Sequence, residues 1–187
     1  MRKALHRLNI KADFHFLSYE LNPDLSETGE AIDRFFERRH LWGQSKLLNY
    51  QENIIAVAAS AGVSIDFSKR THYYNSGKAH HLMHWAEGYD RQQELNELLI
   101  DAYFKHGLDI GNPFILTDIV EQLGLDSSKA IQVLYSSVVD EQLLLKKQRV
   151  QQLALPSIPA FIVNDSTLIS GSKSVNYFEQ ALRSIRR

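Results

Sequence analysis

The stretch that decides the fold is residues 154–173, ALPSIPAFIVNDSTLISGSK, which predicts a β-hairpin near the carboxyl end of the chain. Two short runs of β-forming residues, 160–163 and 167–169, lie on either side of the polar turn 164–166. This is the pattern of paired antiparallel strands. Pro159 directly precedes the first run. Because proline cannot donate to a ladder, it belongs at the first residue of a strand, and X-Pro bonds are also the ones that become cis.

The composition is that of an ordinary globular protein of one or two domains. The 187 residues are 44% hydrophobic and 23% charged, with a net charge of −1. No block of like charge indicates a nucleic-acid or anionic-membrane partner. The longest apolar run, residues 54–63, is too short to span a bilayer, and residues 1–6 lack the apolar core of a signal peptide. We therefore expect a cytoplasmic protein with neither nucleic acid nor a membrane as partner.

The sequence contains no cysteine. Its own residues therefore cannot form disulfides, thiolate zinc sites or a redox-active thiol pair.

A further strand is predicted at residues 12–21, far from the hairpin in sequence. Phe14 and Phe16 fall on one face and Tyr19 on the other, which is typical of a strand covered on both faces. Between this strand and the hairpin the hydrophobic period is helical, so the pattern predicts one sheet interrupted by a long helical block. The expected helices are residues 2–8, 28–39, 45–61, 75 or 76 to 87, 91–106, 112–123, 126–136, 140–153 and 174–186.

Several short motifs follow one another in a fixed order. They are the first strand with Asn22-Pro23-Asp24, then Asn75, Ala79-His80 and Trp85-Ala86, then Tyr103-Phe104 and residues 107–110, then residues 157–161, and finally Gly171-Ser172-Lys173. In this order they resemble the DsbA-like thioredoxin-fold family, and within it the FrnE-type thiol–disulfide oxidoreductases. The wider group includes 2-hydroxychromene-2-carboxylate isomerases and kappa-class glutathione transferases. The resemblance implies an α/β, thioredoxin-like domain at residues 1–25 and 154–187, with an all-α helical insertion domain at residues 26–153.

The chain departs from this family at its amino end. The family begins with a strand and then a CxxC motif, or a serine in the isomerase and transferase branches, on the first turn of a helix. Here Met1 corresponds to a point partway along that helix, so we expect the first strand and the nucleophile to be missing. That strand would lie between residues 12–21 and 160–164. Its loss predicts no catalytic residue in this chain, an open sheet edge and a tendency to form homo-oligomers.

The substrate-binding side of the family's site is what the resemblance assigns to this chain. It implies that the backbone of Ile158, before a cis Pro159, pairs with a thiol- or disulfide-bearing peptide or with the cysteinyl part of glutathione. Ser172 and Lys173 would hold a carboxylate just before the last helix. A plain strand-start proline and an ordinary turn with a helix cap are the alternative interpretations. Apart from glutathione, no cofactor is expected.

Histidines at helical spacing raise the question of a metal site. His80 and His84 are four residues apart on a predicted helix, with His72 and His81 nearby. The sequence offers no third ligand at a specific spacing, and the family uses no metal here. We therefore expect these side chains to make packing or polar contacts between helices.

Three functions stay open at this point. The first is a thiol–disulfide oxidoreductase whose amino end is absent from this sequence and which is inactive as given. The second is a glutathione-dependent isomerase or transferase of the same group, its serine likewise missing. The third is a non-catalytic thioredoxin-fold binding module, in which another segment or a second copy fills the sheet.

Overall fold

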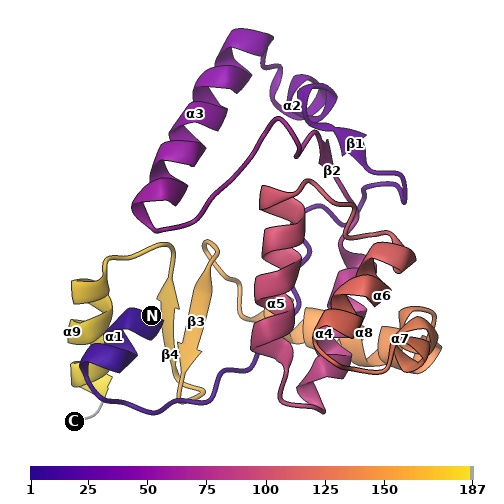
Figure 1. Ribbon diagram of the computed structural model, residues 1–187. Coiled ribbons are helices and arrows are strands. Elements are labelled where there is room, and N and C mark those ends of the chain that lie inside the picture. Colours follow the sequence, from indigo (N-terminus) through magenta and orange to yellow (C-terminus); the bar gives the residue numbers. More distant parts are fainter. Residues whose placement is uncertain (186–187) are drawn as a thin grey trace. The chain divides into compact units, whose positions relative to one another are not determined.

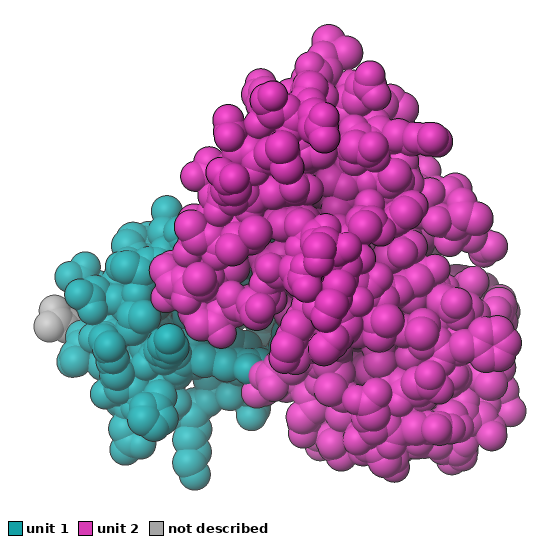
Figure 2. Space-filling view, turned by 45° about the horizontal axis from the view of Figure 1, so that its top comes forward, with its two compact units in different colours: residues 1–17, 146–187 teal, residues 18–145 magenta. Residues whose placement is uncertain are grey.

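The structure, a computed structural model, describes residues 1–185. Figure 2 colours two compact units, one made of Met1–Leu17 with Lys146–Arg187 and the other of Ser18–Leu145. The limits predicted from sequence, 25/26 and 153/154, each lie eight residues after the limits of this division, 17/18 and 145/146. The assignment of the units as a thioredoxin-like domain and an insertion domain stays a prediction.

The first unit contains a β-hairpin, the helices at the two ends of the chain and the end of a third helix (Figure 1). β3 (Ala160–Val163) pairs antiparallel with β4 (Thr167–Ser170), so that Phe161 lies opposite Ile169. The predicted hairpin is thereby confirmed. α1 (Arg2–Arg7) packs beside α9 (Val175–Ile185). The buried core of the first unit is formed by Ala4, Leu5, Ile169, Phe178 and Leu182.

The turn of the hairpin follows from its polar residues. Asn164 and Asp165 have φ of 50° and 53°, and the Ser166 N–H donates to the Val163 carbonyl at 3.3 Å. Consecutive residues with positive φ match the twist of the two strands, and asparagine and aspartate tolerate that conformation better than most residues. The sequence signal and the observed turn therefore agree.

The prediction of a strand at residues 12–21 is wrong. This segment has no strand assignment, and in the described part of the chain the two sheets are β1–β2 and β3–β4. A strand needs a neighbour to complete its backbone hydrogen bonds, and the alternation of phenylalanines has another cause here. Phe14 packs against the core of the first unit and under the guanidinium of Arg2, whose Cζ lies 5.5 Å from the ring centroid.

The second unit is mainly helical, as predicted. Residue Glu30 pairs with Tyr73 between the short strands β1 (Glu30–Ala31) and β2 (His72–Tyr73). Because residues 30 and 31 form this strand, the helix predicted from residue 28 begins only at Ile32. The other elements are α2 (Ile32–His40), α3 (Gln44–Ser60), α4 (Gly77–Glu87), α5 (Gln92–Ile100), the π-helical turn η1 (Asp101–Lys105), α6 (Pro113–Gln122), α7 (Ser127–Leu134) and α8 (Ser137–Gln152), the last of which continues into the first unit.

Side-chain caps begin two of these helices where the sequence predicts them. The Asn112 carboxamide oxygen accepts from the Phe114 N–H at 2.9 Å, and the Asp126 carboxylate accepts from Ser128 and Lys129. Each cap satisfies backbone N–H groups that have no partner within the helix. The largest fully buried side chains of this unit are Leu82, Leu95, Leu116 and Val120.

An aromatic cluster holds α2 and α3 against the loops around them. Phe35 and Phe36 are 5% exposed, and Phe36 stacks on Trp42 with ring centroids 4.9 Å apart. Leu25, Ile32 and Leu47 complete the buried part of this cluster. Among residues 1–185, no helix has both the length and the apolar character needed to cross a bilayer.

Candidate functional site

The residues predicted to bind substrate lie at the open end of the β3–β4 hairpin. The Ile158–Pro159 peptide bond is cis, and residue Ile158 is 44% exposed. Ser172 and Lys173, which follow β4, are also exposed. The Gly171 N–H donates to the Pro159 carbonyl at 2.8 Å. This bond joins the two segments, so the structure brings the predicted residues together within the first unit.

The register determines which backbone groups of β3 face away from β4. In an antiparallel ladder, bonding to a given neighbour alternates from residue to residue. The Gly171–Pro159 bond and the pairing of Phe161 with Ile169 place the odd-numbered residues on the β4 side. The N–H and C=O groups of Ala160 and Ile162 therefore point to the other side, where β3 has no strand partner in the described part of the chain. We call these groups, with Ile158 before them, the β3 edge.

Serine hydroxyls tie the segment before Pro159 to β4. The Ser170 hydroxyl donates to the Ser157 carbonyl at 2.9 Å. It lies 2.7 Å from the Ser157 hydroxyl, which must then be the donor of that bond. Neither serine was predicted to belong to the site. The only signal in the sequence is their position, one at each base of the predicted hairpin.

The start of α9 supplies the other side of the site. Ser174, and not Ser172, caps this helix, because its hydroxyl accepts from the Tyr177 N–H at 3.2 Å. Within residues 1–185 the structure shows no hydrogen bond for the Ser172 hydroxyl, which leaves it available for a ligand. The Lys173 ammonium lies 5.4 Å from the centroid of the Tyr177 ring, a cation–π contact that keeps the lysine close to the helix start.

Comparison with known proteins places this hairpin and its helices in a family. A DSBA-like thioredoxin domain matches residues 3–183 of the chain. The chain belongs to the DsbA-like thioredoxin family. It has the thioredoxin-like DsbA fold with a large helical insertion, as the sequence predicts.

Two known proteins are similar to this chain over most of their length. A probable DsbA oxidoreductase from Streptomyces coelicolor superposes with a TM-score of 0.86 and 21% identity, over 98% of this chain and 80% of that one. The uncharacterized protein YwbO of Bacillus subtilis (strain 168) is 29% identical over 171 residues, which is 91% of this chain and 80% of that protein.

Two histidines of α4, His81 and His84, contact other helices of this DsbA-like chain. The His81 ring, on α4, lies 3.1 Å from the Val133 carbonyl through Nδ1 and 3.0 Å from the Asp140 carboxylate through Nε2. His84 Nε2 lies 2.7 Å from the Gln142 side-chain oxygen. Among the described residues, no group of three or more histidines and carboxylates is placed to hold a metal ion.

A buried arginine is the feature of the second unit that sequence reasoning missed. Arg70 is 5% exposed, whereas arginine is normally a surface residue. Its Nη2 donates to the Tyr103 hydroxyl at 2.8 Å. Burial raises the pKa of Tyr103 to about 12, although the nearby Arg70 charge acts in the opposite direction.

Proposed function

We propose that residues 1–187 form the substrate-binding side of a DsbA-type thiol–disulfide oxidoreductase and that, as given, they bind an extended peptide without exchanging disulfides. The observation that carries this proposal is the β3 edge, whose Ala160 and Ile162 backbone groups face away from β4. A peptide that adds there as a strand completes these hydrogen bonds. Disulfide exchange needs a thiolate, and the sequence contains no cysteine.

The groups around the β3 edge suggest how a peptide is held. Its backbone pairs with Ala160 and Ile162 and continues to Ile158. The Ser172 hydroxyl and the Lys173 ammonium lie beyond the end of β4, where they reach a carboxylate of the ligand. Four to six backbone hydrogen bonds at about 1 kcal/mol each correspond to a dissociation constant of about 0.04 to 1 mM. We therefore expect the peptide to bind weakly and to dissociate rapidly.

Fluorescence anisotropy with a labelled peptide tests this mode of binding. The peptide carries one cysteine, and two further versions are methylated on alternate sets of backbone nitrogens. Strand addition uses only one of these sets, so one methylated peptide should lose binding while the other binds like the parent. Equal loss with both, or with neither, would contradict strand addition. Replacing the peptide's cysteine by serine should change its affinity little, because the chain offers no thiol partner.

A non-catalytic thioredoxin-fold binding module is the second candidate, and the absence of cysteine from the 187 residues favours it. The coding sequence upstream of Met1 separates the candidates. An in-frame strand followed by Cys-x-x-Cys supports the oxidoreductase, a serine at that site supports a glutathione-dependent isomerase or transferase, and an in-frame stop supports the module. Membership in the FrnE-type branch, glutathione as a ligand, a homo-oligomer and a cytoplasmic location stay predictions.

A further inference from the structure

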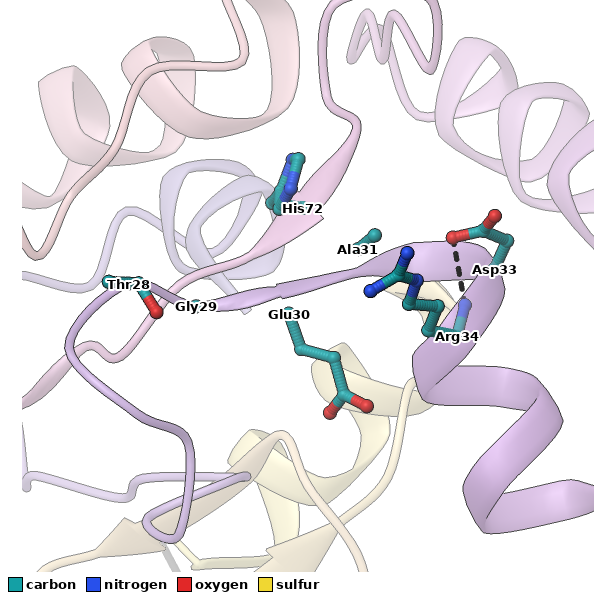
Figure 3. A pocket seen from close by; sticks show the side chains of 7 residues that line it. All are labelled: Thr28, Gly29, Glu30, Ala31, Asp33, Arg34 and His72. Carbon is teal, nitrogen blue, oxygen red and sulfur yellow. Dashed lines mark hydrogen bonds between the residues drawn. The ribbon is translucent and has the colours of Figure 1, made fainter.

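A polar pocket of about 610 Å³ lies in the second unit, where β1 passes into α2 opposite β2 (Figure 3). It is lined by residues 28–31, Asp33, Arg34 and His72. All of these belong to one compact unit, so the pocket is independent of the β3 edge. Its size is in the range of sites that bind small molecules.

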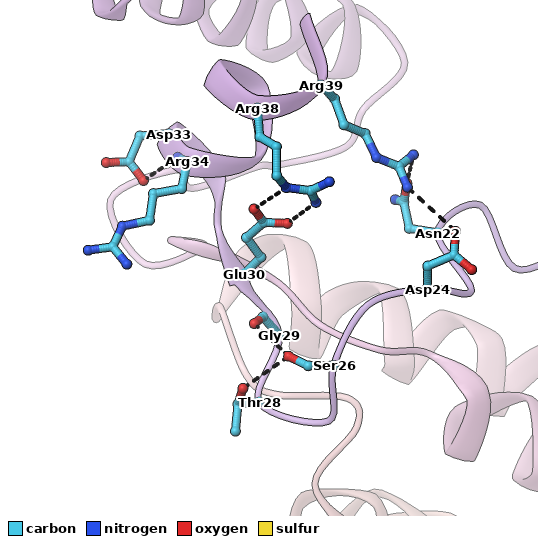
Figure 4. Close-up of polar contacts among 10 residues, drawn as sticks. All are labelled: Asn22, Asp24, Ser26, Thr28, Gly29, Glu30, Asp33, Arg34, Arg38 and Arg39. Carbon is cyan, nitrogen blue, oxygen red and sulfur yellow. Dashed lines mark hydrogen bonds and ion pairs between the residues drawn. The ribbon is translucent and has the colours of Figure 1, made fainter. Parts of the chain in front are cut away.

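The acidic side chains of this pocket already have partners. The Glu30 carboxylate accepts from Nε and Nη2 of Arg38, and this hydrogen bonding holds the pKa of Glu30 below its usual range (Figure 4). The Asp33 carboxylate accepts from the Arg34 backbone N–H at 2.8 Å. Because Glu30 already forms an ion pair with Arg38, its carboxylate attracts a further cation less strongly than a free carboxylate would.

The Arg34 guanidinium is the cation left for a ligand. Within the described residues no hydrogen bond or ion pair is shown for it, and in Figure 4 its end is turned away from the neighbouring pairs. In Figure 3 it lies beside Ala31 at the pocket. Its planar N–H groups match the two oxygens of a carboxylate. The Thr28 hydroxyl and the His72 ring are further polar groups of the lining.

A second cation, Arg70, contacts β2, the strand that contributes His72 to the lining, through the ring of Tyr73. The buried Arg70 contacts aromatic rings and one hydroxyl, and within residues 1–185 no carboxylate pairs with it. Its Nε is buried without a hydrogen-bond partner. The Tyr103 hydroxyl, which receives the Arg70 bond, donates in turn to the carbonyl of His72 in the lining. The rings are Phe67, Tyr73, Tyr103 and Phe104, with centroids 4.5 to 5.4 Å from the guanidinium carbon.

The balance of these charges favours an anion. Glu30 is paired with Arg38. The Asp33 carboxylate accepts only from a backbone N–H, so the two remaining cations, Arg34 and Arg70, exceed it by one positive charge. Buried charges are normally paired, and an unpaired buried cation produces a positive potential at the nearby surface. Tyr103 also belongs to the π-helical turn η1, a local irregularity that is often found at functional sites.

We propose that this pocket binds the carboxylate of a small ligand, with Arg34 as its direct partner and Arg70 as the buried charge that favours it. The shared chemistry is a carboxylate, either of a small organic acid or at the carboxyl end of a short peptide. Binding here does not require a peptide at the β3 edge.

Amide chemical shifts of the full chain, recorded by NMR during titration, test the proposal. The probes are succinate, N-acetyl-triglycine and N-acetyl-triglycine amide. Either of the first two should shift the amides of residues 29–34 and 72, whereas the amide should not. Response to succinate alone indicates a free acid, and response to N-acetyl-triglycine alone indicates a peptide end. Arg34→Gln should weaken binding about tenfold or more, since it removes a charged hydrogen-bond donor.

Arg183→Gln on α9 is the matched control, because it removes an exposed arginine of the other unit and should leave binding unchanged. The proposal is overturned if neither carboxylate probe shifts the pocket amides, if the amide probe shifts them equally, or if the two arginine variants weaken binding alike. The last result would mean general attraction by surface charge. A failure of peptide binding at the β3 edge would not change the expected response of the pocket amides to the carboxylate probes.

Discussion

The backbone N–H of Gly171 donates to the carbonyl of Pro159 at 2.8 Å, and this bond extends the β3–β4 ladder one pair beyond Ala160 and Ser170. It determines the direction of every following backbone group of β3. Because bonding alternates along the ladder, Ala160 and Ile162 present their groups on the side away from β4. The proposed function depends on this relationship.

Replacing Gly171 should destabilise the hairpin. Gly171 has φ of +81°, and a Cβ at this position would lie 3.3 Å from the Ser157 hydroxyl oxygen. Gly171→Ala should lower the free energy of unfolding by about 1–2 kcal/mol, since positive φ is unfavourable for residues with a Cβ. Urea denaturation measures the change. Gly62→Ala, at φ of +78° with no atom within 4 Å, is the control for backbone strain alone, and a larger loss there would contradict this explanation.

Ser170→Ala tests the hydroxyl link to Ser157. The variant removes both hydrogen bonds between these residues and should cost about 1 kcal/mol of stability. It should also weaken peptide binding, because the segment before Pro159 is then held less firmly. Urea denaturation and the anisotropy titration report the two effects. Ser166→Ala in the exposed turn is the matched control; if it weakens binding equally, the link has no specific role.

The ring pair Phe161–Phe178 should couple the hairpin to α9. The ring centroids are 5.3 Å apart at an interplanar angle of 80°, an edge-to-face geometry. A double-mutant cycle with Phe161→Leu and Phe178→Leu should give a coupling free energy of about 0.5–1.5 kcal/mol. The free energies of unfolding of the four proteins provide it. Strict additivity would show that the two rings do not stabilise each other.

Stability should decline in strong base because of Tyr103. Its pKa is near 10 in the unfolded chain and is raised to about 12 by burial in the folded one. Between these two pH values the unfolded chain loses the Tyr103 proton before the folded chain does. The stabilisation that the protonated Tyr103 gives to the folded state is therefore complete below pH 10 and is lost as the pH rises through 12. The loss is about 2–3 kcal/mol.

Tyr103→Phe isolates this effect. At neutral pH the variant should be less stable by about 1–3 kcal/mol, because the hydroxyl bonds to Arg70 and to the His72 carbonyl are lost. Above pH 10 its stability should fall less steeply than that of the parent protein. Parallel curves from pH 9 to pH 12 would show that Tyr103 does not titrate in the way its burial implies. Urea denaturation at each pH supplies both curves.

The elements predicted correctly from sequence are those that depend on residues close together in the chain. Helices were predicted well because hydrophobic period and capping residues such as Asn112 and Asp126 act over a few neighbouring residues. The hairpin was predicted for the same reason, since its turn residues and β-rich runs are adjacent. The positions of Ile158, Pro159, Ser172 and Lys173 at its open end follow once the strands pair.

Features that depend on a distant partner could not be predicted. Residues 12–21 alternate like a strand, but alternation does not reveal whether a neighbouring strand exists. β1 and β2 are two residues each, too short for any period. The link between Ser157 and Ser170 depends on the register, and the burial of Arg70 depends on rings that lie up to 34 residues further along the chain.

Hydrogen exchange of the β3 amides, followed by NMR with and without the peptide, tests the central claim most directly. In the free protein, the amides of Phe161 and Val163, which face β4, should exchange slowly, and those of Ala160 and Ile162 should exchange quickly. Saturating peptide should slow Ala160 and Ile162, together with Ile158, and leave the other two unchanged. Peptide binding that protects none of these three amides, or protects the odd-numbered amides instead, would contradict strand addition at the β3 edge.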